Sequence, residues 1–165
     1  MPTHRQEVEA ILAGAAAERE ALLSAVSPAL RASLPVDATG ITQAIAHLAA
    51  ALGLSDELQA EQAAGHRANP AVLHGRVFGR APLSPDTVLA AFVDGARVRA
   101  GALAHLAEAI GGAPLVERLR AALAAHPLPD GDAGEDADAT AGALHAAYAA
   151  QERAVVTLAR RLDER

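Results

Sequence analysis

Large apolar residues recur every three or four positions in four long segments, and this spacing constrains the fold more than any other feature. The segments contain the stripes Val8–Leu30, Ile41–Leu52, Leu89–Ile110 and Leu144–Leu162. A period near 3.6 residues is typical of helices that bury one face. No segment has a convincing strand pattern, so we expect an all-α protein.

Local signals predict where these helices begin and end. Thr3 and Gln6 have the spacing of a capping box at the start of the first helix. Gly53 is placed to end the second helix in a left-handed conformation. Ser84-Pro85-Asp86 predicts the start of the third helix, and Gly111 with the glycine after it predicts its end.

These segments predict a four-helix bundle with one or two additional short helices, in a single domain of residues 1–165. Residues 127–140 hold five acidic residues and no basic one, so we expect a flexible linker before the last helix. The chain has 45 alanines, which allow helices to approach closely but bury little apolar area each. We therefore expect association into a homodimer.

Composition excludes several classes of function. The chain has no cysteine, which rules out disulfides, thiolate zinc sites and a cysteine nucleophile. No apolar run reaches the roughly 18 residues of a transmembrane helix, and no apolar leader follows Met1, so we expect a cytoplasmic protein without a membrane partner. The net charge of −6 argues against binding to nucleic acid.

A family resemblance rests on the order of four segments. They are Glu18-Arg19-Glu20-Ala21-Leu22-Leu23, Ser27-Pro28-Ala29-Leu30, Gly40-Ile41-Thr42-Gln43-Ala44-Ile45-Ala46-His47-Leu48-Ala49 and Ser84-Pro85-Asp86-Thr87-Val88-Leu89. This order resembles the DinB / mycothiol-dependent maleylpyruvate isomerase superfamily over roughly the first 110 residues. The resemblance implies a metal-binding helical bundle, in which the A-H-L-A stretch of the second helix supplies a metal ligand, here His47.

The resemblance also implies an H-x-x-x-H pair on a later helix, and this chain departs from that pattern. His145 stands on the last long helix, but Ala149 occupies the second position. Glu152 lies two turns after His145 on the same face and could replace the missing ligand. The expected ligand set is therefore His47, His145 and Glu152, holding zinc or another divalent metal with an open position. Such a site would suit a metal-assisted thiol transferase or isomerase that uses a thiol cosubstrate.

A basic stretch gives an alternative function. It gathers the residues His66, Arg67, His74, Arg76 and Arg80 within an acidic protein. Arginine binds carboxylate and phosphate groups through a bidentate fork. The chain could therefore be a non-catalytic binding or assembly module that takes a small anionic ligand or an acidic partner, or the stretch could be a solvated loop. Whether the protein is an enzyme stays open on the sequence alone.

Three other metal or phosphate chemistries fit less well. Di-iron bundles use E-x-x-H motifs, whereas His105 and Glu108 stand in the reverse order. A histidine phosphotransfer domain built on His47 would be expected to carry a lysine nearby, and the chain has none. The acidic stretch from Asp130 lacks the glycine and glutamate positions of a calcium-binding EF-hand loop.

Overall fold

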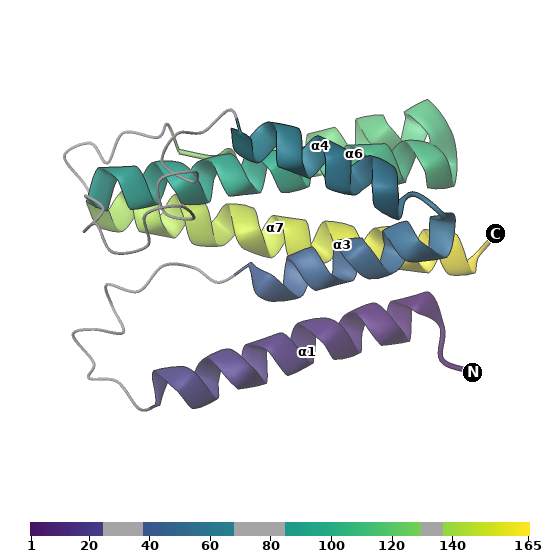
Figure 1. Cartoon of the computed structure of the whole chain (residues 1–165), viewed down its shortest axis with the longest axis horizontal. Helices are drawn as coiled ribbons and strands as arrows, with labels where there is room; N and C mark the ends of the chain where they lie inside the picture. Colours follow the sequence, from purple (N-terminus) through teal and green to yellow (C-terminus); the bar gives the residue numbers. More distant parts are fainter. Residues whose placement is uncertain (25–37, 68–84, 130–136) are drawn as a thin grey trace.

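The computed structural model describes residues 1–24, 38–67, 85–129 and 137–165, and within these ranges the chain forms helices and no strand (Figure 1). The helices are α1 (His4–Leu23), α3 (Thr39–Leu52), α4 (Ser55–Arg67), α6 (Pro85–Ala124) and α7 (Ala137–Asp163). The prediction of an all-α protein is confirmed. None of these helices is both long enough and apolar enough to cross a lipid bilayer.

Helix α3 is the centre of the arrangement because it contacts all four other helices. Helix α1 packs against α3 and α7, and α6 packs against α4 and α7. The two chain ends lie at the same end of the molecule, so the first turn of α1 is beside the last turn of α7 (Figure 1). This juxtaposition positions the polar cluster described below.

The end of α3 follows the sequence prediction. Gly53 has a φ of 71°, the left-handed conformation that glycine adopts most readily. Its N–H donates to the Ala50 carbonyl at 3.2 Å, and the Leu54 N–H donates to the Ala49 carbonyl at 2.8 Å. This pair of bonds is a Schellman motif, which satisfies two carbonyls that the helix itself leaves unpaired.

Helix α6 is interrupted where the paired glycines predicted a helix end. Gly112 has φ 72° and ψ −165°, outside the helical region. Pro114 follows and lacks the N–H that a continuous helix would use. The helix therefore consists of a long segment and a shorter one, and the shorter segment turns in a new direction (Figure 1).

The core depends on a small number of large apolar side chains surrounded by alanines. The largest fully buried side chains are those of Val8, Ile41, Ile45, Leu48, Val93, Leu103, Leu106, Val155 and Leu158. They come from α1, α3, α6 and α7, and most belong to the predicted stripes. Each such side chain contributes roughly 1.5–3 kcal/mol of burial free energy, so few substitutions in this set would be tolerated.

One polar network crosses the core between α6 and α7. Arg99 is 9% exposed and Gln151 is 2% exposed. Arg99 Nε donates to Gln151 Oε1 at 3.1 Å, and Gln151 Nε2 donates to the Ala96 carbonyl at 2.8 Å. The guanidinium carbon of Arg99 lies 4.7 Å from the ring centroid of Tyr148. In the described part of the chain, the partners of this buried cation are therefore neutral groups.

Candidate metal centre

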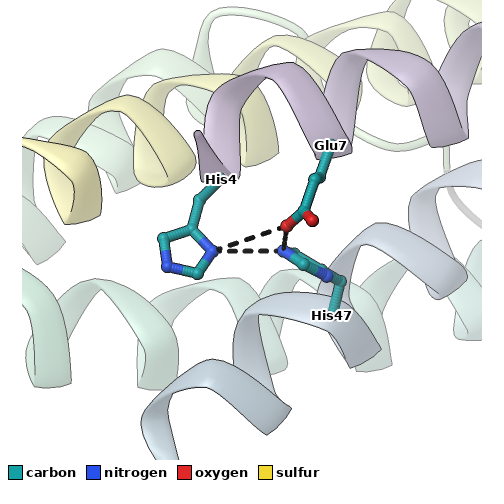
Figure 2. Close-up of side chains that lie close together, drawn as sticks. All are labelled: His4, Glu7 and His47. Atoms are coloured by element: carbon teal, nitrogen blue, oxygen red, sulfur yellow. Dashed lines mark hydrogen bonds and ion pairs between the residues drawn. The ribbon is translucent and has the colours of Figure 1, made fainter. Parts of the chain in front are cut away.

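His47 lies between α3 and α1, where it meets two side chains of the first turn of α1 (Figure 2). Its Nε2 atom is 2.9 Å from Glu7 Oε2 and 3.2 Å from His4 Nδ1. The third separation, from His4 Nδ1 to Glu7 Oε2, is 4.0 Å. We call these three residues the His/Glu cluster. Among the described residues, it is the group of histidine and carboxylate side chains whose ligand atoms converge as a metal site requires.

Helix geometry brings these side chains together. His4 and Glu7 are three residues apart, so they share one face of the first turn of α1. The buried Gly40 of α3 lets α1 approach closely, since a Cβ atom built there would lie only 2.9 Å from the Ala15 Cβ. Because α1 is held this near to α3, His47 reaches the face that carries His4 and Glu7.

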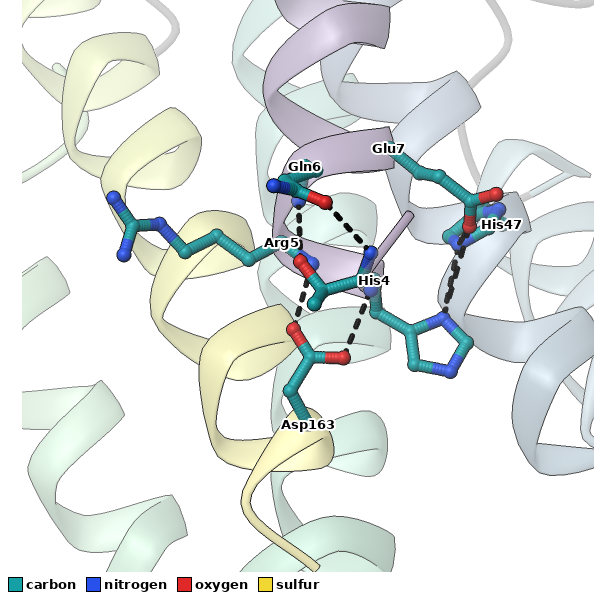
Figure 3. A network of polar contacts seen from close by, with 7 residues as sticks. His4, Arg5, Gln6, Glu7, His47 and Asp163 are labelled. Atoms are coloured by element: carbon teal, nitrogen blue, oxygen red, sulfur yellow. Dashed lines mark hydrogen bonds and ion pairs between the residues drawn. The ribbon is translucent and has the colours of Figure 1, made fainter. Parts of the chain in front are cut away.

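The first turn of α1 is fixed by hydrogen bonds to each of its free amides (Figure 3). The predicted capping box is confirmed: Thr3 N–H donates to Gln6 Oε1 at 2.9 Å, and Gln6 N–H donates to Thr3 Oγ1 at 3.2 Å. Asp163, at the end of α7, accepts the other two amides, from His4 at 2.8 Å and from Arg5 at 2.9 Å.

These bonds favour the charged form of the Asp163 carboxylate. The Arg5 amide lowers the pKa of Asp163 most, and the His4 amide adds to the effect. The carboxylate also faces the positive end of the α1 dipole. Asp163 thus links the end of α7 to the backbone of the residue that carries one ligand of the cluster.

Without a metal ion, the hydrogen-bond donors and acceptors of the His/Glu cluster are poorly matched. A hydrogen on His47 Nε2 has to serve two acceptors, the Glu7 carboxylate and the His4 ring nitrogen. If His4 Nδ1 carries a hydrogen as well, two N–H groups face each other at 3.2 Å. A cation among the three atoms would satisfy all of them at once.

A second histidine with acidic neighbours has a different geometry. His105 Nδ1 lies 3.2 Å from Glu61 Oε1, and its Nε2 lies 3.4 Å from Glu57 Oε2. Each ring nitrogen therefore faces a separate carboxylate, and the ring stands between them. This histidine is about as exposed as those of the His/Glu cluster, at 31%, and provides a natural control for them.

The structure separates His47 from the other two residues of the expected ligand set. His145 and Glu152 are exposed on α7 and are not part of the His/Glu cluster. Asp163 is the residue of α7 that lies beside the cluster, because it accepts the His4 amide. His145 precedes Asp163 by eighteen residues, or about 27 Å of helix. His47 therefore has His4 and Glu7 as its neighbours, on the helix that the expected set left out.

The predicted anion-binding residues lie at or beyond the edge of the described chain. His66 and Arg67 belong to the last turn of α4, and His74, Arg76 and Arg80 lie outside the described residues. Of the linker predicted over residues 127–140, residues 130–136 also lie outside the described chain, whereas 137–140 are not linker but the first turn of α7.

Comparisons with protein-family models, with curated proteins and with solved structures found no match to this chain. The chemistry of the His/Glu cluster therefore carries the functional argument.

Proposed function

We propose that this protein binds one divalent transition-metal ion, preferably zinc, between α1 and α3. The ligands are His4 Nδ1, Glu7 and His47 Nε2. The observation that carries the proposal is the convergence of these three atoms, with separations of 2.9, 3.2 and 4.0 Å. In a tetrahedral zinc site with bonds near 2.0–2.1 Å, ligand atoms stand about 3.4 Å apart, so small side-chain rotations suffice to bind the ion.

The donor set favours zinc or iron over calcium and magnesium. Two imidazole nitrogens and one carboxylate suit borderline metals, whereas the alkaline-earth ions prefer oxygen ligands alone. Zinc sites with two histidines and one glutamate are typical of catalytic centres, because three protein ligands leave a position for water or substrate. The side chains of the cluster are 25–39% exposed, so solutes can reach that position.

The chemistry at the open position is the second part of the proposal. We infer a metal-assisted transferase or isomerase that takes a thiol cosubstrate, as the resemblance to the DinB / maleylpyruvate isomerase superfamily suggests. His47, the ligand that the resemblance assigned, belongs to the cluster. The chain has no cysteine, so the sulfur has to come from a small molecule. Metal coordination would favour the thiolate, which is the nucleophilic form.

Cobalt substitution tests both parts. Apo protein without a histidine tag is titrated with Co²⁺, and tetrahedral coordination is read from the intensity of the visible absorption. We expect one site per chain in the parent and in His105→Ala, and binding weaker by more than about 100-fold in His47→Ala and Glu7→Gln, since loss of a ligand exceeds the usual effect of an outer partner. Equal binding in all four proteins, or none in the parent, would refute the metal site.

A monothiol such as N-acetylcysteine is then added to the cobalt protein. A new thiolate-to-cobalt charge-transfer band supports the thiol transferase or isomerase. An unchanged spectrum would refute the thiol chemistry and leave the metal as a link between α1 and α3.

A further inference from the structure

A groove of about 630 Å³ runs between the short second segment of α6 and the last turns of α7. This volume is within the usual range for sites that bind small molecules, about 300–1,000 Å³. The groove shares no residue with the His/Glu cluster, although both lie near the end of α7.

The floor of the groove is apolar. Leu115 and Leu119 line it from α6, and Ala154 and Leu158 line it from α7. All four are buried by the packing of the two helices, so they present a firm surface rather than mobile side chains. An apolar chain or ring placed there would be removed from water on one side.

The rim of the groove is strongly basic. It carries Arg118 from α6 and Arg153, Arg160 and Arg161 from α7, and the single acidic residue is Glu164. The whole chain, in contrast, has a net charge of −6. The rim of the groove is therefore positively charged although the protein as a whole is negatively charged.

Most of these arginines also lack a partner among the residues that the structure describes. Elsewhere in the described chain, Arg5, Arg97 and Arg120 pair with acids of their own helix, and Arg165 donates to the Ala109 carbonyl at 3.3 Å. On the rim, Arg161 approaches Glu164 at 3.8 Å. The side chains of Arg118, Arg153 and Arg160 make no hydrogen bond or ion pair with any described residue. In the described ranges, the arginine side chains without a partner thus gather on one groove.

We infer that this groove binds a small amphipathic anion, whose apolar part rests on the leucine and alanine floor and whose carboxylate or phosphate is held by the arginines. A guanidinium fork accepts either oxyanion in bidentate fashion. The two arginines Arg153 and Arg160 are seven residues apart on α7, two turns of one face, so a single head group can lie between them.

Calorimetry with chemically matched probes tests this inference. Decanoate and decyl phosphate carry both features, decanol carries only the tail, acetate carries only the charge, and decyltrimethylammonium reverses the charge. All are used below micelle-forming concentrations with protein that has been stripped of metal and then freed of chelator, so that the metal proposal can fail without affecting the result. We expect one decanoate or decyl phosphate per chain, and the tighter of the two identifies the head group. Binding of neither, or equal binding of decanol or decyltrimethylammonium, would overturn the inference.

Variants locate the site. Arg153→Gln/Arg160→Gln should weaken binding of the anion by about tenfold or more, because two charge-assisted hydrogen bonds are lost. Ala122→Phe should also weaken it, since this exposed alanine lines the groove and a larger side chain there fills the space without disturbing the core. Arg97→Gln removes an exposed arginine outside the groove and should have no effect. Unchanged affinity in the double variant would assign the anion to another surface.

Discussion

Two polar groups of side chains, one between α6 and α7 and one between α1 and α3, differ in burial and in geometry. Between α6 and α7, Arg99 and Gln151 are buried, and their hydrogen bonds end on each other and on the α6 backbone. Between α1 and α3, the side chains of the His/Glu cluster are partly exposed, and three ligand atoms point toward one another. Arg99 Nη2 of the first group is also buried, without a hydrogen bond to any described residue. A buried network of this kind ties two helices together, whereas side chains that converge on a common point are suited to bind something there. The predictions below test this difference.

The largest effect is expected from Gln151→Ala. This change removes the hydrogen-bond partner of a buried guanidinium, so we expect the free energy of unfolding to fall by about 2–4 kcal/mol. Gln43→Ala, at an exposed position on α3, should change it by less than about 0.5 kcal/mol. Chemical denaturation measures both, and a Gln151→Ala protein as stable as Gln43→Ala would show that the network contributes nothing.

Zinc bound to the His/Glu cluster should stabilise the protein by a comparable amount. At a free Zn²⁺ concentration of 100 times Kd, binding to the folded state alone adds about 2.7 kcal/mol to the free energy of unfolding. This gain should be absent in His47→Ala and retained in His105→Ala. Thermal unfolding with and without zinc provides the measurement, and a gain that survives in His47→Ala would place the metal elsewhere.

A smaller effect is expected from Asp163→Asn, which weakens the link between α7 and the first turn of α1. The folded-state pKa of Asp163 is below its ordinary value, so its stabilising contribution is present above the ordinary pKa and is lost as the pH falls through the folded pKa. The stability difference between the parent and Asp163→Asn should therefore shrink on acidification in metal-free protein. A difference that is the same at neutral and acidic pH would contradict the role of the carboxylate charge.

The smallest effect is expected from His47→Ala in the absence of metal. The contacts of His47 with His4 and Glu7 are partly exposed, and their hydrogen-bond donors and acceptors are poorly matched. Removing these contacts should therefore change the free energy of unfolding by less than about 1 kcal/mol. Chemical denaturation in chelator tests this. A loss as large as that of Gln151→Ala would mean that the cluster is a structural network like the one between α6 and α7.

The sequence predicted the features that depend on residues near each other in the chain. The capping box of Thr3 and Gln6, the left-handed Gly53 and the helix break at Gly112 are each produced within one helical turn. Local chemistry is enough to specify them, because the partners are at most a few residues apart.

The candidate site could not be predicted in the same way. His4 and Glu7 have a visible signal, the spacing of three residues in the first turn of a helix, but their partner His47 is 43 residues from His4. Only the register of α1 against α3, set in part by the close approach at Gly40, shows that the three meet. The burial of Arg99 is not predictable from the sequence for a related reason. Arginine on a helix is usually solvent-exposed, and Arg99 is buried because α7 packs against α6.

Metal content measures the central claim most directly. The parent, His47→Ala and His105→Ala are purified without histidine tags, loaded with Zn²⁺, desalted and analysed for metal and protein. The His/Glu cluster predicts one zinc per chain in the parent and in His105→Ala, and none in His47→Ala. A parent protein that retains no metal, or a His47→Ala protein that retains as much as the parent, would contradict it.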